Sequence, residues 1–185
     1  MLTLTPSQTV GPFVAILVPS QDRGSLVTER TSGPRIVVEG MVRDGADTPV
    51  PDALVEIWQA NAAGHYRHPD DPRPSADDTF DGYGRMHTRR DGRFTFETIK
   101  PGSVTGPSGT PQAPHLVVGL YARGLLTRLL TRMYFEDEPS NGQDPILTAV
   151  PAERRTTLIA TCESEGRYRL DLALQGTRET VFFDV

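Results

Sequence analysis

The histidines of this chain are the first residues to consider as metal ligands. His65 and His68 lie three positions apart, and Asp70 and Asp71 follow them, so imidazole and carboxylate donors gather in one short segment. Such donors suit transition metals. The segment is a polar loop, however, which lacks the fixed spacing of a helix, and no further histidine follows before His87. The residues alone therefore favour a solvated loop over a metal site.

A second candidate ligand is His115, which opens an apolar run. On a strand, residues two positions apart point to the same side, so a His-x-His pair can place two imidazoles on one metal. The matching position here is Val117, which has no donor atom. A metal at His115 would need all its other protein ligands from elsewhere in the chain, so a structural histidine is the favoured interpretation.

The arginines Arg123, Arg128 and Arg132 form a third group. A guanidinium can bind a carboxylate through two parallel hydrogen bonds. If the strand that begins at His115 runs straight, His115 and Arg123 are about 26 Å apart, so the two are not expected to serve one small site. From the residues alone, a salt bridge at the edge of the domain is favoured over anion binding.

Other common catalytic patterns do not occur in the sequence, which has no glycine-rich phosphate loop, no GxSxG nucleophile elbow and no CxxC pair. The single cysteine, Cys162, excludes an internal disulfide and suits a reducing compartment. The net charge is −5 with no block of like charge, which argues against nucleic acid as a partner. The longest apolar run of the N-terminal region, Phe13 to Val18, is too short for a signal peptide or a membrane span, so a cytoplasmic protein is expected.

The elements that must position these residues are mostly strands. The 17 glycines and 16 prolines fall at short intervals between apolar runs, which is typical of short strands joined by turns. We expect a β-sandwich of about eight short strands with one or two short helices. The expected strands are residues 35–42, 53–59, 93–99, 115–122, 131–135, 167–174 and 179–183, and the expected helix is residues 151–160, with a proline near its first turn.

Two segments stand outside this pattern. Residues 1–34 are expected to form an extended arm that precedes the domain of residues 35–185, because each proline pushes the residue before it toward extended geometry. Residues 61–83 form a long polar loop, and such a loop inside a compact domain is usually functional or an interaction surface.

Several blocks of the sequence resemble the intradiol ring-cleaving dioxygenases. They run from the arm to the C-terminus, and their combination is specific, whereas no single block is. The blocks are TPSQTVGPF, VEGMVRDGADTPVPDALVEIWQANAAGHY, FDGYGRMHTRRDGRFTFETIKPG, QAPHLVVGLYARG, TRMYFEDE and GTRETVFFDV. The resemblance implies a β-sandwich oxidoreductase that cleaves protocatechuate with O2 to 3-carboxy-cis,cis-muconate, in the β-ketoadipate pathway of aromatic catabolism.

The resemblance also implies a ferric non-heme iron held by two tyrosines and two histidines, and this chain departs from that pattern. Iron-binding members carry a tyrosine in the loop after KPG and a His-x-His at the start of the next strand, usually with an arginine a few residues before it. Here the loop reads Ser103-Val104-Thr105, Gln112 stands near the position of the arginine, and residues 69–80 contain no tyrosine. His115 is then a remnant of the ligand pair, and this chain is expected to hold no metal and no catalytic residue.

This departure resembles the alpha subunit of a heteromeric member, whose iron is held by its beta subunit. The resemblance implies that the arm packs on the partner subunit, and that Thr9, Gly11 and Pro12 wall the substrate pocket there. It implies that Arg123 lies near the carboxylate of the substrate. The expected cofactor is Fe(III) in the beta subunit, the expected small-molecule partners are protocatechuate and O2, and the expected assembly is a higher-order alpha–beta oligomer.

Two other interpretations stay open. The strand and turn pattern of residues 35–60 would also permit a transthyretin-like binding or scaffold module without catalysis. An independent metalloenzyme would use His65, His68 and His87. Metal analysis of the chain alone tests the last interpretation, and co-expression with a beta-like partner separates the first two.

Overall fold

The long strands of this chain each turn an apolar face inward. In β1 (Arg35–Arg43), Ile36 and Val38 are buried. They share a face because successive side chains of a strand point to opposite sides. The computed structural model describes residues 9–11, 16, 22–71, 73, 79–106 and 109–184.

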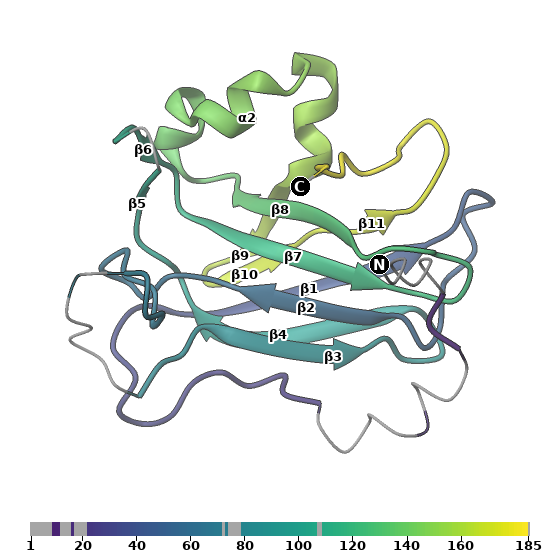
Figure 1. Cartoon of the computed structure of the whole chain (residues 1–185), viewed down its shortest axis with the longest axis horizontal. Coiled ribbons are helices and arrows are strands. Elements are labelled where there is room, and N and C mark those ends of the chain that lie inside the picture. Colours follow the sequence, from purple (N-terminus) through teal and green to yellow (C-terminus); the bar gives the residue numbers. More distant parts are fainter. Residues whose placement is uncertain are drawn as a thin grey trace, which may run out of the picture.

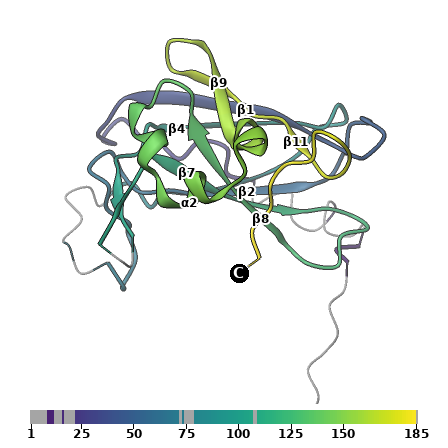
Figure 2. The same ribbon diagram turned by 90° about the horizontal axis from the view of Figure 1, so that it is seen from above.

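Nine strands form one curled sheet, in the order β11-β1-β10-β9-β8-β7-β2-β3, with β4 paired to β1. The sheet folds over so that β2, β3, β7 and β8 lie opposite β1 and β4 (Figures 1 and 2), and the apolar residues of both layers share a core. The predicted β-sandwich is confirmed. The other strands are β2 (Leu54–Trp58), β3 (Tyr83–His87), β4 (Arg93–Ile99), β5 (Val104–Thr105), β6 (Pro111–Gln112), β7 (His115–Tyr121), β8 (Leu129–Phe135), β9 (Ile159–Ser164), β10 (Arg167–Arg169) and β11 (Leu172–Ala173).

The end of the chain returns to its first strand. β1 pairs in parallel with both β10 and β11, and Val37 lies opposite Arg167. Gly40 lies where β1 passes from one of these partners to the other, and a Cβ atom there would collide with the carbonyl oxygen of Leu170. The predicted strand 167–174 is divided at this point because the carboxylate of Asp171, not a backbone carbonyl, accepts from the amide of Met41 at 3.1 Å.

The helical segments follow β8. They are η2 (Pro139–Gln143), α2 (Pro145–Ala149) and η3 (Ala152–Leu158), and none in the described part of the chain is long and apolar enough to cross a membrane. Asp144 caps α2, with its Oδ1 accepting from the amides of Ile146 and Leu147 at 2.9 and 2.8 Å. The predicted helix 151–160 is present but its bounds are wrong: it is a 3-10 helix over Ala152–Leu158 that gives way to β9 at Ile159.

The predicted strand 179–183 is also wrong. Its backbone makes only one isolated bridge, between Leu130 and Phe183. Side chains make other links: the hydroxyl of Thr180 accepts from the amide of Ala173 at 3.0 Å, and the hydroxyl of Thr131 donates to the carbonyl of Val181 at 2.7 Å. Because these hydroxyls replace backbone partners, no continuous ladder forms.

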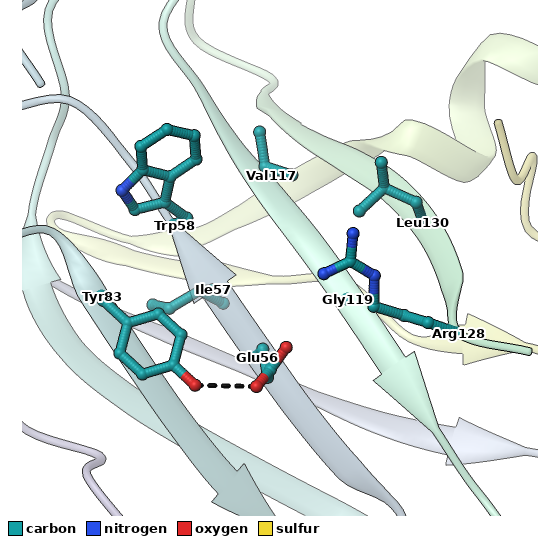
Figure 3. Close-up of a pocket in the computed structure, with 8 residues that line it drawn as sticks. All are labelled: Glu56, Ile57, Trp58, Tyr83, Val117, Gly119, Arg128 and Leu130. Atoms are coloured by element: carbon teal, nitrogen blue, oxygen red, sulfur yellow. Dashed lines mark hydrogen bonds between the residues drawn. The ribbon is translucent and has the colours of Figure 1, made fainter. Parts of the chain in front are cut away.

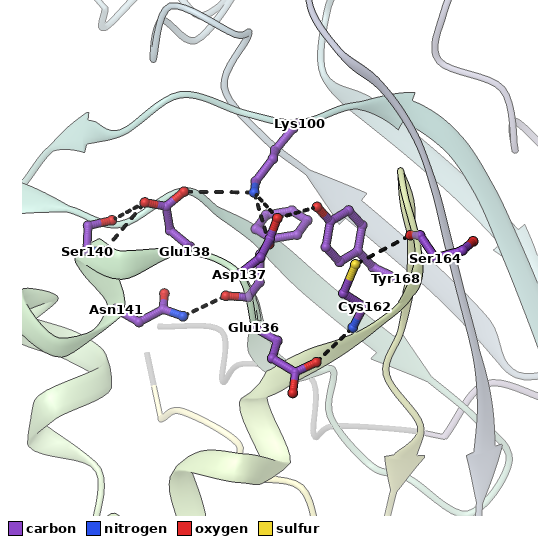
Figure 4. A network of polar contacts seen from close by, with 10 residues as sticks. Lys100, Glu136, Asp137, Glu138, Ser140, Asn141, Cys162, Ser164 and Tyr168 are labelled. Carbon is purple, nitrogen blue, oxygen red and sulfur yellow. Dashed lines mark hydrogen bonds and ion pairs between the residues drawn. The ribbon is translucent and has the colours of Figure 1, made fainter.

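A polar cluster joins the two layers at one end of the sandwich (Figure 4). Lys100, directly after β4, donates to both carboxylate oxygens of Asp137 at 3.0 Å, and the hydroxyl of Tyr168 donates to the same carboxylate at 2.9 Å. The ammonium group also lies 5.3 Å from the centre of the Phe135 ring. Residues from β4, β8 and β10 thus meet around a single amine.

The described part of the predicted arm contacts this chain's own sheet. Arg23 pairs with Arg85 of β3, Ser25 pairs with Glu97 of β4, and Leu26 is buried. Packing of the residues before these on a partner subunit stays a prediction.

Candidate functional site

The turn after β7 brings together two of the predicted site residues. The hydroxyl of Thr9 accepts a hydrogen bond from the amide of Gly124 at 2.8 Å and lies 3.4 Å from the carbonyl oxygen of Ala122. Gly124 has a φ of +89°, a conformation that side chains disfavour. Thr9 therefore lies beside the turn that carries Arg123, although more than a hundred residues separate them.

Arg123 extends from this turn toward solvent, with 56% of its side chain exposed. Its Nε forms an ion pair with Oδ2 of Asp52 at 3.2 Å. Its two terminal nitrogens make no hydrogen bond with any described residue. A guanidinium held at Nε keeps its outer pair of N–H donors available for a second carboxylate.

The turn that carries Asp52 is unusual. Asp52 has a φ of +59°, which is uncommon for a residue with a side chain. Its Oδ1 is buried and has no hydrogen-bond partner among the described residues. This carboxylate is thus fixed by the turn before β2, and Arg123 is its one charged contact in the described chain.

The other two predicted wall residues are on the arm. Gly11 is half-buried, and a Cβ atom placed on it would meet nothing within 4 Å among the described residues. Pro12 lies outside the described residues. Their predicted contact with substrate stays a prediction.

His115 is buried, with 3% of its surface exposed, and is fixed by neighbours in this chain. Its Nδ1 lies 2.7 Å from the carbonyl oxygen of Ala113, and its ring lies 5.7 Å from that of Tyr134. Burial, together with the positive charge of Arg132, lowers the pKa of His115 to about 4. The side chain is therefore neutral at physiological pH and belongs to the packing of β7 on β8.

A hydrogen-bond network surrounds this histidine. Arg132 donates to Oε1 of Gln112 at 2.8 Å, and the hydroxyl of Tyr134 donates to Oδ1 of Asp144 at 3.0 Å. Oδ2 of Asp144 accepts from the amide of Ala113 at 2.8 Å. Burial and the nearby Asp144 carboxylate raise the pKa of Tyr134, which outweighs the effect of Arg132. The tyrosine is thus a neutral hydrogen-bond donor.

Comparisons with known proteins decide which family this is. A family model described as Dioxygenase matches residues 11–176. The chain is 40% identical over 200 residues to the protocatechuate 3,4-dioxygenase alpha chain of Pseudomonas putida, covering 100% of this chain and 98% of the relative. Identity to the alpha chain of Burkholderia cepacia is 42% with the same coverage. The chain belongs to the intradiol ring-cleavage dioxygenase family.

Within this family the match extends to the other subunit. The protocatechuate 3,4-dioxygenase beta chain of Burkholderia cepacia is 40% identical over 158 residues, covering 83% of this chain and 64% of that chain. A solved dioxygenase domain from Streptomyces sp. SirexAA-E superposes with a TM-score of 0.65 at 31% identity, covering 94% of this chain and 99% of the domain. The family fold is therefore present along the chain, and the full-length matches to alpha chains assign it to the alpha type.

The family uses a non-heme iron, and the residues around His115 do not fit that metal. Val117 offers no donor, and the hydroxyl of Tyr134 is directed at Asp144. Within the described ranges, no group of three or more His, Cys, Asp or Glu side chains is arranged to hold a metal ion. The residues around His115 are therefore unsuited to hold the iron of the family.

The histidines of the polar loop do not gather either. His87 pairs with Asp22 through its Nδ1 at 2.8 Å, on the strand β3. His68 lies edge-on to the ring of Trp58, with 5.9 Å between centres, and Nδ1 of His65 is buried with no partner in the part of the chain described. The trio required by an independent metalloenzyme is not assembled.

Asp52 is a site residue that the sequence does not mark. It lies about 70 positions before Arg123, so no local spacing connects them. The one available signal is the pair Pro51-Asp52 before an apolar run, which predicts a turn but no partner. The contact of Asp52 with Arg123 depends on the pairing of β2 with β7, which places Leu54 opposite Tyr121 and so brings the two adjoining turns together.

Proposed function

We propose that this chain is the alpha subunit of a protocatechuate 3,4-dioxygenase and completes an active site whose Fe(III) is held by a beta subunit. The observation that carries this proposal is the full-length match to alpha chains in a chain that has valine two residues after His115. The overall reaction combines protocatechuate with O2, breaks the bond between the two hydroxylated carbons and gives 3-carboxy-cis,cis-muconate, with all atoms retained.

Arg123 is assigned to the carboxylate of the substrate. A carboxylate removed from water costs several kcal/mol unless it is paired, and a guanidinium pairs with it at two points. The ion pair with Asp52 supports this role, because it anchors the guanidinium through Nε while more than half of the side chain stays exposed. The substrate is thereby oriented by its substituent, at a distance from the ring carbons that react.

The arm supplies the wall of the same pocket. Thr9, Gly11 and Pro12 are proposed to cover the substrate and exclude water. The hydrogen bond from Gly124 to Thr9 supports this assignment, because it fixes the arm against the turn that carries Arg123. Gly11, which has no described atom within 4 Å of where its Cβ would be, permits close approach of a partner or a ring.

The proposal is tested by co-expressing this chain with a beta-type partner. We expect a stable alpha–beta complex that consumes O2 when protocatechuate is added, with iron in the complex and no stoichiometric iron in this chain purified alone. Stoichiometric iron in the isolated chain contradicts the assignment of the metal to the partner. If no complex and no O2 uptake are found, a non-catalytic scaffold module is the better description.

Substrate discrimination tests the role of Arg123. In the complex, Arg123→Ala is expected to reduce kcat/KM for protocatechuate by an amount on the order of 2–5 kcal/mol, because one carboxylate loses its partner. Catechol lacks the carboxylate and should be affected far less. The matched control is Arg90→Ala, an exposed arginine on the turn before β4. Equal losses with both substrates would argue against this role.

A further inference from the structure

A polar cleft lies between η3 and the loop that follows β11, which is drawn in yellow in Figure 1. It has a volume of about 490 Å³, within the range of ~300–1,000 Å³ that is typical of small-molecule sites. Strand pairing builds its floor, because Thr161 of β9 lies opposite Arg169 of β10, and Arg43 of β1 lies opposite Ala173 of β11. Side chains from four strands, η3 and the loop therefore meet around one cavity.

The polar cleft carries a net positive charge in a chain whose net charge is −5, because four guanidiniums and three carboxylates line it. Arg169 is paired with Asp171 at 3.1 Å. Two other guanidiniums share one carboxylate: Nη2 of Arg178 donates to Oδ1 of Asp47 at 2.9 Å, and Nη1 of Arg43 lies 3.7 Å from Oδ2. One carboxylate cannot neutralise two guanidiniums, so a positive charge is left over on this side of the cleft.

Arg154 of η3 is the fourth guanidinium, and most of its donors are unused. Its Nη2 donates to the carbonyl oxygen of Glu179 at 2.9 Å, which anchors the side chain against the loop after β11. Its Nε is buried without a hydrogen-bond partner, and the guanidinium forms no ion pair with a carboxylate of the described chain. An arginine has five N–H donors in a rigid fork, so this one keeps donors for an incoming anion.

Threonine hydroxyls add neutral donors to the same cavity. Thr156, Thr161 and Thr177 line it, and their hydroxyls make no hydrogen bond with any residue that the structure describes. These donors come from η3, from β9 and from the loop after β11, and thus from different sides of the cleft. A phosphoryl group presents acceptor oxygens in several directions, whereas a carboxylate presents two in one plane. The arrangement therefore suits a phosphate better than a carboxylate.

One carboxylate opposes anion binding in the polar cleft. Glu153 is exposed at its rim and forms no ion pair within the described ranges. Its charge repels an anion through the solvent, and this repulsion is weak because water and salt screen it. The carboxylate therefore lowers the affinity of the site without abolishing it.

We propose that the polar cleft binds a phosphate group, either as inorganic phosphate or as the phosphoryl end of a small ester, with Arg154 as its main cationic contact. The inference does not rest on the proposed function, because Thr9 and Arg123 belong to the turn after β7 and take no part in it.

Calorimetric titration of the full-length chain with inorganic phosphate tests this proposal. The ionic strength is held constant with KCl, because partly exposed charges are screened by salt. Saturable binding at one site per chain is expected, and acetate should bind much more weakly. Glycerol 3-phosphate separates the two sources: binding at least as tight as that of phosphate indicates an ester, and weaker binding indicates free phosphate. If phosphate does not saturate, or acetate binds equally well, the proposal is wrong.

Variants locate the site. Arg154→Gln is expected to raise the Kd for phosphate roughly tenfold, the equivalent of one charge-assisted contact. Glu153→Gln should lower the Kd, because it removes the like charge at the rim, and a structural defect would not tighten binding. The matched control is Arg90→Gln, an exposed arginine on the turn before β4, which should leave the Kd unchanged. Unchanged binding in Arg154→Gln, or weaker binding in Glu153→Gln, would overturn the assignment.

Thr161→Val guards against a loss that comes from misfolding, since Arg154 also anchors the loop after β11. Valine keeps the shape of threonine and suits a strand, and the hydroxyl that it removes has no partner in the described chain. The variant should unfold in urea like the wild type and bind phosphate several times more weakly. Wild-type affinity in Thr161→Val would show that the floor of the cleft does not contact the anion.

A second concave region has to be distinguished from the polar cleft. It lies over β2, β7 and β8, contains Trp58 and Arg128, and shares no lining residue with the cleft (Figure 3). Trp58 is the single tryptophan of the chain, so its emission reports on that region. Phosphate should leave the emission unchanged and should bind normally to Arg128→Gln. An emission change that follows the calorimetric saturation, or a loss of binding in Arg128→Gln, would place the anion there and refute the proposal.

Discussion

Asp52 illustrates, at the scale of single residues, how an acid can prepare an arginine for a ligand. Its carboxylate contacts Nε of Arg123 at 3.2 Å, whereas its other oxygen is buried without a partner in the described chain. The ion pair is partly exposed, so its contribution to stability is small. The ion pair therefore acts mainly on orientation, because it anchors the guanidinium through Nε.

Asp52→Asn is therefore expected to change substrate binding more than turnover. In the complex, KM for protocatechuate should rise by a factor equivalent to about 1 kcal/mol, because Arg123 samples more conformations, whereas kcat should be nearly unchanged. Steady-state O2 uptake with protocatechuate and with catechol is the measurement. A fall in kcat with both substrates would instead indicate a general structural defect.

His115, which the family resemblance predicts to be a remnant of a ligand pair, is part of the packing between β7 and β8. It is neutral and buried, and the groups that face it are Tyr134 and Arg132 from β8 and Asp144 at the start of α2. Burial and Arg132 lower its pKa to about 4, whereas the Ala113 carbonyl and Asp144 act in the opposite direction. The folded state therefore disfavours protonation of His115, whereas the unfolded state allows this histidine to be protonated at its ordinary pKa.

The sign of the resulting pH dependence is fixed by this depressed pKa. Between pH 6.5 and about pH 4 the unfolded state binds the proton and the folded state does not, so acidification destabilises the fold. The contribution is about 3 kcal/mol between these limits. In His115→Gln the free energy of unfolding, measured with urea, should fall less steeply over this range than in the wild type. Parallel pH profiles would contradict the assignment.

At the scale of elements, β1 depends on a glycine where its parallel partner changes from β10 to β11. A side chain at Gly40 would meet the carbonyl oxygen of Leu170, which is backbone and cannot swing away. The close approach of β1 to Leu170 therefore requires a residue without a side chain at position 40.

Gly40→Ala is expected to destabilise the protein by about 3 kcal/mol or more, because a strand must move to admit one methyl group. The control is Gly142→Ala in η2, where a Cβ atom meets nothing within 4 Å among the described residues. Urea unfolding of both variants gives the comparison. If Gly40→Ala unfolds like the control, β1 and Leu170 are not held as closely as described.

The sequence predicts the strands with clear alternation and misses those without it. The expected strands 35–42, 93–99 and 115–122 are confirmed as β1, β4 and β7 to within one residue. β9 is hidden by Pro151 and the charged residues after it, which favour a helix until Ile159 pairs with Tyr134. β3 is missed for another reason: it starts where the predicted polar loop 61–83 ends, and its sequence YGRMH has no alternation of apolar and polar residues.

At the scale of the whole molecule, the candidate site is less predictable than the fold. Thr9, Asp52 and Arg123 come from three distant parts of the chain, and their contacts exist only after β2 pairs with β7. The roles of Thr9 and Arg123 were expected from family resemblance, whereas Asp52 carries no sequence signal. Periodicity predicts which face of a strand is buried, but it contains no information on which turns meet.

The polar cluster around Lys100 links both layers, and its energy can be measured. Lys100→Met keeps an unbranched side chain of similar length but removes the charge that lies over the Phe135 ring. We expect a coupling of about 0.5–1 kcal/mol between Lys100→Met and Asp137→Asn in a double-mutant cycle, because Asp137 is 45% exposed. The coupling should shrink at high salt. A value near zero at low salt would show that the cluster does not stabilise the sandwich.

The return of β10 and β11 to β1 has a consequence for how the protein is made. Arg167, the parallel partner of Val37, is synthesised about 130 positions after it. At a synthesis rate of ~5–20 residues per second, the first strand is without this neighbour for roughly ten seconds on the ribosome. During that time β1 can pair only with β4, and its other edge is open to foreign strands. Nascent chains of this protein are therefore expected to depend on chaperones until nearly the last residue has been added.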